Sequence, residues 1–222
     1  TTAGHPVIGA RIRQAKQKGA KIIVAEPRVI DLSSDADVFL QIMPGTNVAL
    51  YNAMMNVIIS EGLQNSAYIE ERTEKYDDLV AAVSSFTPEK AAEICGVSAD
   101  DIRAAARLYA KAAKASIFYS MGVTQHTTGT EGVMSLSNLT LLCGNIGIES
   151  GGINPLRGQN NVQGACDMGG LPGDLTGYQK VANPDALAKF EKAWGVKLSD
   201  KPGVTLTEIV HKAGHGDIKF LY

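Results

Sequence analysis

The sequence predicts an α/β fold in which a parallel sheet carries helices on both faces. Short apolar segments followed by polar or glycine-rich chain indicate buried strands at Lys21–Ala25, Val38–Ile42 and Ala115–Ser120. Helical patterns separate these segments, and strands that alternate with helices favour parallel pairing. The 222 residues suffice for one large domain and part of a second. We therefore expect an α/β domain over residues 1–150, followed by a glycine-rich segment over residues 151–222 that belongs to a neighbouring α/β domain.

The helices are predicted from apolar periodicity together with start and stop residues. The first covers Pro6–Lys18, with proline in its first turn and Gly19 as its stop. The others occupy Thr46–Ser60, Ser66–Arg72, Asp77–Ser85, Pro88–Cys95, Ala99–Ala113, Glu131–Cys143, Pro184–Trp194 and Thr205–Lys212. Residues Gly144–Gly177 are rich in glycine and predict a long loop. The last residues, Asp217–Tyr222, have the pattern of a strand that is beginning.

Composition and charge exclude several classes of function. The chain is 45% hydrophobic and 20% charged, with a formal net charge of -2, so nothing favours binding to nucleic acid or to an anionic membrane. No apolar run approaches the roughly 18 residues of a membrane span. Cys95, Cys143 and Cys166 lie far apart, so neither a zinc site nor an iron–sulfur cluster is expected from them. Free thiols favour a cytoplasmic location, with a periplasmic one as the alternative.

Three polar segments follow the predicted strands, where open parallel sheets bind ligands. They are Glu26–Arg28, Pro44–Asn47 and Met121–His126. An acid such as Glu26 can accept hydrogen bonds from a ribose, although it can equally be a solvated turn charge. Pro44–Asn47 can be a turn with Thr46 or Asn47 as N-cap, and a helix N-terminus also suits an anion or a purine edge. The third segment can be an ordinary polar loop, and no glycine motif typical of NAD or NTP sites is present.

The run RGQNNVQGACDMG, Arg157–Gly169, combines polar, flexible and charged residues with little aliphatic content. Arg157 lies two residues before Gln159, and the glycines allow the backbone to approach a ligand closely. The guanidinium of Arg157 suits a carboxylate, although it can also hold a glycine-rich loop through carbonyl contacts. His211 and His215 are four residues apart, but Gly214 and Gly216 interrupt their helix, so no metal ligands are predicted.

Taken together, these segments resemble the middle portion of the catalytic subunit of molybdopterin-dependent formate dehydrogenases. The resemblance covers essentially the whole chain, and its most specific part is RGQNNVQG. In chain order, its parts are HPVIGARIRQAK, KIIVAEPR, ADVFL, PGTNVAL, MGVTQH and RGQNNVQGACDMG. The family usually has Asp-Pro-Arg where this chain has Glu26-Pro27-Arg28, and the longer carboxylate can still reach a ribose.

The resemblance implies reversible oxidation of formate to carbon dioxide at a bis-molybdopterin guanine dinucleotide centre with molybdenum or tungsten. Arg157 would hold the formate carboxylate, and Gly158 with Gln159 would lie on the pyranopterin. The cofactor would also contact Met121, Gly122 and Gln125. A guanosine end would be surrounded by Glu26, Pro27, Arg28, Gly45 and Asn47. No protein ligand of the metal is expected within this chain.

The resemblance also implies parts that this chain lacks, namely a [4Fe-4S] cluster segment, a selenocysteine or cysteine metal ligand, and a C-terminal barrel-like domain. The first strand of the domain is expected just before Thr1. We therefore expect a fragment that is inactive alone, in which residues 1–150 bind the dinucleotide. The expected partners are formate and carbon dioxide, the rest of the subunit and iron–sulfur electron-transfer subunits. The alternatives are another molybdopterin oxidoreductase, such as a nitrate reductase, which Arg157 with Gln159 argues against, and a non-enzymatic module.

Overall fold

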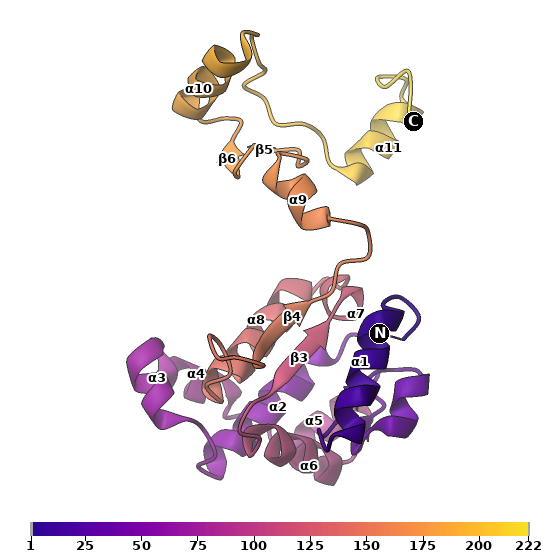
Figure 1. Cartoon of the computed structure of the whole chain (residues 1–222), viewed down its shortest axis with the longest axis vertical. Helices are drawn as coiled ribbons and strands as arrows, with labels where there is room; N and C mark the ends of the chain where they lie inside the picture. The colour runs from indigo at the N-terminus through magenta and orange to yellow at the C-terminus, as the bar shows by residue number, and fades with distance from the viewer. Residues whose placement is uncertain (1, 222) are drawn as a thin grey trace. The chain divides into compact units, whose positions relative to one another are not determined.

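The computed structural model describes residues 2–221, which form two compact units (Figure 1). The first unit ends at Leu156 and the second begins at Arg157, whereas the sequence suggested a boundary at residue 150. Residues 151–156 belong to the first unit because they contain a strand that pairs within it. No helix in residues 2–221 is long and apolar enough to cross a membrane.

The first parallel strand pair of this unit joins β1 (Ile23–Ala25) to β2 (Val38–Leu40). Helix α1 (Pro6–Gln17) and the 3-10 helix η1 (Asp31–Asp35) belong to its N-terminal part. One small core cluster combines Ile22, Val24 and Leu32 with the partly buried Ile12, Ile30, Ala36 and Phe39. Other residues of the same two strands pack into the larger core. Both faces of this pair are therefore covered, as the sequence predicts.

The second parallel pair joins β3 (Ser116–Tyr119) to β4 (Gly152–Pro155), with Tyr119 opposite Pro155. The buried Asn145 fixes the start of β3, because its Oδ1 accepts a hydrogen bond from Ala115 N at 2.9 Å. Ile117 of β3 packs against the core, whereas Phe118 is 44% exposed. Parallel pairing of the predicted strands is thus confirmed. The described strands of this first unit form two separate parallel pairs rather than one continuous ladder.

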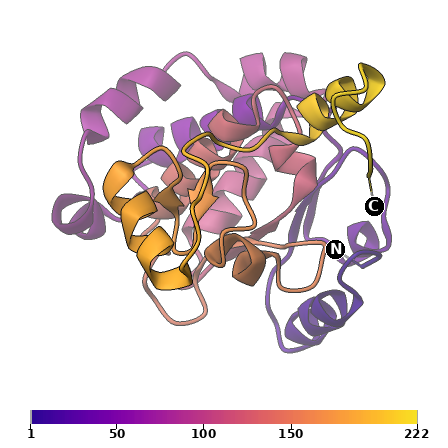
Figure 2. The ribbon, with the colours of Figure 1, turned by 90° about the horizontal axis from the view of Figure 1, so that it is seen from above.

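Helix α2 (Asn47–Ser60) is the centre of the larger core. It packs against α5 (Pro88–Cys95), α6 (Ala99–Ala110) and α8 (Gly129–Leu142), and its side chains Leu50, Met55 and Ile58 are fully buried. The shorter helices of the unit are α3 (Ser66–Arg72), α4 (Tyr76–Val83) and α7 (Met121–Thr124). Figure 2 shows α1 and α3 on opposite sides of this unit. Ser98 caps the start of α6, because Asp101 N donates to Ser98 Oγ at 3.0 Å.

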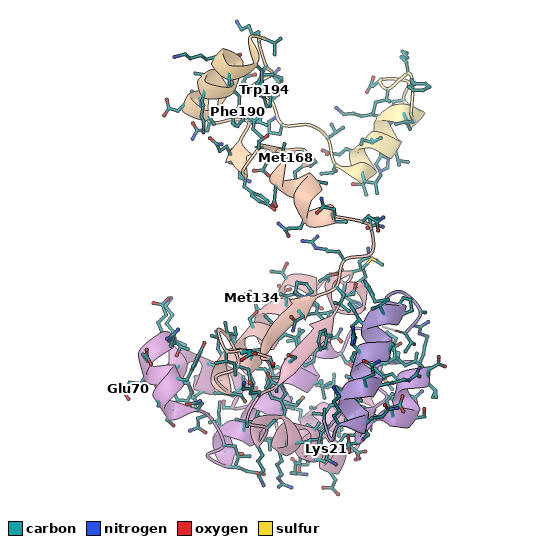
Figure 3. The ribbon with its side chains drawn as sticks, viewed as in Figure 1. Lys21, Glu70, Met134, Met168, Phe190 and Trp194 are labelled. Carbon is teal, nitrogen blue, oxygen red and sulfur yellow. The ribbon has the colours of Figure 1, made fainter. Side chains whose placement is uncertain are left out.

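The described residues of the second unit form three helices and a small hairpin. Helix α9 (Val162–Asp167) precedes the antiparallel strands β5 (Asp174–Leu175) and β6 (Gln179–Lys180). Helices α10 (Pro184–Trp194) and α11 (Leu206–Gly214) follow. In α10 the Phe190 and Trp194 rings lie 4.9 Å apart between centroids (Figure 3).

Two sequence-based expectations about irregular and terminal chain differ from the structure. The glycine-rich stretch Gly144–Gly177 contains β4, α9 and β5, rather than loop alone. The terminal strand predicted at Asp217–Tyr222 is wrong for residues 217–221, which have no strand, while residue 222 lies outside the described residues. Strand β4 depends on tertiary pairing with β3, which local apolar periodicity does not report.

Candidate functional site

The first candidate segment, Glu26–Arg28, directly follows β1. Glu26 Oε1 accepts hydrogen bonds from Arg28 N at 3.3 Å and from Arg28 Nε at 3.0 Å. The side chain of Gln41, which the sequence analysis did not select, donates to Pro27 O at 3.1 Å and ties the turn to the end of β2. The guanidinium of Arg28 remains 79% exposed. This turn therefore presents a carboxylate and a guanidinium side by side at the carboxyl end of β1.

The second segment, Pro44–Asn47, leads from β2 into α2. Because β1 and β2 are parallel with Ala25 opposite Leu40, this segment and Glu26 follow strands that end at the same edge. Gly45 has φ +84°, and a Cβ placed there would meet open space. Thr46 occupies the N-cap position, but its hydroxyl donates to Met43 O at 2.7 Å and does not cap the helix. The first turn of α2 is therefore left without a Thr46 cap, which favours an anionic or polar ligand there.

Asn47, the first residue of α2, is 9% exposed. The interpretation that Thr46 caps this helix through its side chain is wrong, because the hydroxyl is oriented toward the preceding turn. Asn47 and Gly45 thus border the uncapped helix end. An uncapped N-terminus with a close-approach glycine beside it is a suitable place for a polar ring or a phosphate.

The third segment begins at α7, directly after β3. Met121 is 56% exposed, and a Cβ placed on Gly122 would meet nothing within 4 Å. Gln125 is exposed, and its backbone N–H donates to Met121 O at 2.9 Å. Beneath this surface Val123 is buried, and His126 Nε2 lies 3.1 Å from Gly122 O. The segment therefore exposes the backbone of Gly122 and the side-chain amide of Gln125, while the buried Val123 anchors it.

Arg157, Gly158 and Gln159 are exposed and lie before α9, at the start of the second unit. A Cβ placed on Gly158 would meet open space, so the backbone there is accessible to a ligand. Asn161, with φ 49°, caps α9 by accepting a hydrogen bond from Gly164 N at 3.2 Å. The segment thus combines an accessible guanidinium and amide with a capped helix that follows them.

A polar cluster of the second unit, absent from the sequence-based candidates, holds α9 to the chain after β5. Gln163 Nε2 donates to Asp167 Oδ1 and to the Tyr178 hydroxyl, each at 2.8 Å, and that hydroxyl donates to Asp167 Oδ1 at 2.9 Å. The hydrogen bond to Asp167 raises the pKa of Tyr178. The spacing of Gln163 and Asp167 places both on one helix face, but no sequence signal indicates Tyr178, whose φ is +58°.

No group of three or more His, Cys, Asp or Glu residues able to hold a metal ion occurs within residues 2–221. The cysteines are all free: Cys95 is buried, whereas Cys143 and Cys166 are partly buried. The candidate segments instead offer hydrogen-bonding groups, a guanidinium and open glycines. Such groups bind organic ligands and anions rather than bare metal ions.

Comparison with known proteins agrees with these features. Residues 2–222 match the profile of the family described as molybdopterin oxidoreductase. The chain therefore belongs to the molybdopterin oxidoreductase family, whose members use a molybdopterin cofactor.

Two curated relatives are similar over 98% of this chain. The chain is 51% identical to the F420-dependent formate dehydrogenase subunit alpha of Methanocaldococcus jannaschii, of which it covers 32%. It is 47% identical to formate dehydrogenase H of Escherichia coli, of which it covers 31%. The chain thus spans about a third of the length of these relatives.

Among solved structures, the acetylene hydratase from Pelobacter acetylenicus is similar, with a TM-score of 0.61 and 29% sequence identity. The similarity covers 63% of this chain and 19% of that chain. The resemblance in fold thus extends to a protein named for a hydration reaction. Membership of the family therefore does not by itself define the reaction.

The residues present fit a large polar cofactor. Gly45 and Gly122 support this fit, because at both positions a Cβ would project into open space. The uncapped start of α2 offers backbone N–H groups, and Glu26 offers carboxylate oxygens at the same sheet edge. A dinucleotide requires such donors and acceptors together with close backbone approach.

Proposed function

We propose that this chain is part of the catalytic subunit of a formate dehydrogenase that reversibly oxidises formate to carbon dioxide. The observation that carries the proposal is 51% and 47% identity to two proteins named formate dehydrogenases, over 98% of the chain. The chain spans about a third of those relatives, so the activity is assigned to a whole protein that contains it. The isolated chain is expected to be inactive.

The cofactor that we propose is bis-molybdopterin guanine dinucleotide carrying molybdenum or tungsten. Glu26, Pro27, Arg28, Gly45 and Asn47 are assigned to its guanosine end, because a carboxylate suits a ribose and an uncapped helix suits a polar ring. Met121, Gly122, Gln125, Gly158 and Gln159 are assigned to the pterin part. When bound, the cofactor supplies the redox chemistry, while the protein supplies binding and orientation.

Arg157 is assigned to the formate carboxylate. A guanidinium can donate two parallel hydrogen bonds to one carboxylate, which fixes both the position and the orientation of a molecule as small as formate. Gln159, two residues further along, adds an amide that can hydrogen-bond to the cofactor. The role of Arg157 is therefore to hold the substrate in a reactive orientation, a contribution that positioning residues make in many enzymes.

The relatives that support formate as substrate are much more similar to this chain than the hydratase is. The identity is 51% and 47% for the two formate dehydrogenases, compared with 29% for the hydratase. This difference favours formate over the substrate of another molybdopterin oxidoreductase, such as nitrate. We further propose that the rest of the subunit carries a [4Fe-4S] cluster, that iron–sulfur subunits accept the electrons, and that the enzyme is cytoplasmic.

The proposal is tested in the full-length protein that contains this chain. Its molybdenum and tungsten content is measured, together with reduction of a dye by formate. Arg157→Lys keeps the charge but loses the planar geometry, so kcat/KM for formate should fall by the equivalent of about 2–4 kcal/mol. Arg72→Lys is the matched control, because Arg72 lies on α3 and pairs with Glu71. Unchanged formate kinetics in Arg157→Lys with full metal content would contradict the proposal.

A further inference from the structure

Ser120 links two candidate segments that are far apart in the sequence. This partly buried residue lies between β3 and α7, directly before Met121. Its hydroxyl donates a 2.7 Å hydrogen bond to the carbonyl oxygen of Leu156. Leu156 directly precedes Arg157, so one side chain connects the start of the Met121–Gln125 segment with the residue before the substrate arginine.

The backbone of Leu156 is held from both sides. Its N–H donates to Tyr119 O at 2.7 Å, and its carbonyl oxygen accepts the bond from Ser120. The first bond continues the pairing of β3 with β4 beyond the register pair Tyr119 and Pro155. The second bond is not needed for that pairing, because a side chain donates it to the Leu156 carbonyl, which leads into Arg157.

The orientation of the Leu156 carbonyl affects Arg157 because a peptide unit is planar. The carbonyl group of Leu156 lies in one plane with the backbone N and the Cα of Arg157. A hydrogen bond that fixes the carbonyl therefore also fixes the direction in which the chain enters Arg157. Without that bond, rotation about the Leu156 backbone can reorient the whole peptide unit.

We propose that Ser120 is a positioning residue for Arg157. The hydroxyl of Ser120 orients the Leu156–Arg157 peptide and so sets the direction in which the chain enters the substrate arginine. The inference rests on the proposed role of Arg157 in formate binding. Ser120 touches neither substrate nor cofactor in this assignment, and it acts through the peptide that it holds.

The test uses Ser120→Ala and Ser120→Thr in the full-length protein, with kinetics normalised to metal content. Ser120→Ala should raise the KM for formate about five- to tenfold, the effect of losing one hydrogen bond, with a smaller change in kcat. Ser120→Thr keeps the hydroxyl and should restore the wild-type KM. Ser120→Cys, a weaker donor, should give an intermediate KM and serves if the alanine variant does not fold.

A double-mutant cycle separates positioning from general support of the fold. If Ser120 acts through Arg157, Ser120→Ala should add little to the KM defect of Arg157→Lys. Effects that add fully, or an unchanged KM in Ser120→Ala, would overturn the proposal while leaving the formate assignment of Arg157 intact. Unchanged kinetics in Arg157→Lys alone would instead overturn the proposed function.

Hydrogen exchange supplies a readout that does not depend on activity. In Ser120→Ala, a peptide spanning Leu156 and Arg157 should exchange faster than in the wild-type protein, while a peptide within β3 should exchange at an unchanged rate. Equal exchange at Leu156 and Arg157 in both proteins would overturn the proposed tether. Faster exchange throughout β3 would also overturn it, because Ser120 would then support the sheet as a whole.

Discussion

Gly129 lies so close to Thr124 that a Cβ at position 129 would overlap the Thr124 carbonyl oxygen. Thr124 ends α7 and Gly129 begins α8, so the two helices meet at this contact. Gly129 is buried, whereas Gly122 in α7 faces open space. The contact fixes the base of the segment that carries Met121 and Gly122, and it leaves the exposed surface of that segment accessible.

This arrangement predicts opposite consequences for two glycine-to-alanine substitutions. Gly129→Ala should lower the free energy of unfolding by about 1–3 kcal/mol, because a methyl group must displace backbone. Gly122→Ala should leave stability unchanged or raise it slightly, since its methyl group meets open space and alanine favours a helix. Thermal or denaturant unfolding of the chain measures both effects.

In the full-length protein, the same two variants distinguish an effect on folding from an effect on cofactor binding. If the cofactor lies against Gly122, the added methyl group should lower the molybdopterin content of Gly122→Ala although the protein is stably folded. The pterin content of purified protein, measured by fluorescence after oxidation, tests this expectation. A wild-type content in Gly122→Ala would show that the cofactor does not approach this glycine.

Asp37 joins α1 to the residues just before β1 through three hydrogen bonds. Its carboxylate accepts from Lys16 Nζ at 2.6 Å, from Ile22 N at 2.8 Å and from Lys21 Nζ at 3.1 Å. The bond from Lys16 is the largest cause that holds the pKa of Asp37 well below its usual range, followed by the bond from Ile22. Asp37→Asn should therefore lower the melting temperature at neutral pH.

The pH dependence of this effect has a defined direction. Because the pKa of Asp37 is lowered on folding, its contribution to stability is complete above the unfolded-state value of about 3.9 and is lost as the pH falls below it. The difference in melting temperature between wild type and Asp37→Asn should therefore be constant from pH 7 to pH 5 and shrink in stronger acid. Asp100→Asn is the control, because its carboxylate is 97% exposed. A difference that does not vary with pH would contradict the assigned ion pairs.

The three thiols should differ in their reactivity. Burial raises the pKa of Cys143 to about 12 and also raises the pKa of Cys95, which is fully buried. Since the thiolate is the reactive form, a raised pKa lowers the rate of alkylation at pH 8. Iodoacetamide should therefore modify the partly buried Cys166 first, as followed by mass spectrometry of peptides. Labelling of Cys143 before Cys166 in the folded chain would contradict the burial of that thiol.

Much of the fold could be predicted because local patterns and tertiary structure agree. Pro88–Cys95 and Pro184–Trp194 are helices with the predicted bounds, since each begins with proline and ends before a glycine that adopts positive φ. Strand β4 could not be predicted, because Gly152–Pro155 has little strand propensity and is ordered by pairing with β3. Helix α9 was also missed, since it is short and contains Gly164.

The residues of the candidate site could likewise be predicted only in part. The segments after β1, β2 and β3 could be selected because ligands of parallel sheets bind beyond the carboxyl ends of the strands. Gln41, Ser120 and Tyr178 could not be selected, because each acts through a partner distant in the sequence. Thr46 has the residue type and the position of a helix cap, but its hydroxyl donates to Met43 O instead. Residue type thus indicated where the candidate segments lie, and tertiary contacts define what their side chains do.

Exchange rates should change abruptly at Arg157. The sequence predicts that the loop Gly151–Gly173 is poorly ordered without cofactor, but within it Gly152 N bonds to Ala115 O and Met168 N bonds to Gly164 O. Residues 157–161 have no helix or strand. We therefore expect fast hydrogen exchange at 157–161 in the isolated chain, and slower exchange in β4 and α9.

Cofactor binding should slow exchange at residues 157–161 selectively, because a bound ligand stabilises the ordered state that it recognises. The measurement compares exchange of peptides from this segment in the isolated chain and in the full-length protein loaded with cofactor. Peptides from α10 are the control, since its Phe190 and Trp194 pair within the helix itself. If residues 157–161 are as protected in the isolated chain as β1, the segment is ordered by the chain alone. Its order would then not depend on the cofactor, and the assignment of Gly158 and Gln159 to the pterin would lose its physical basis.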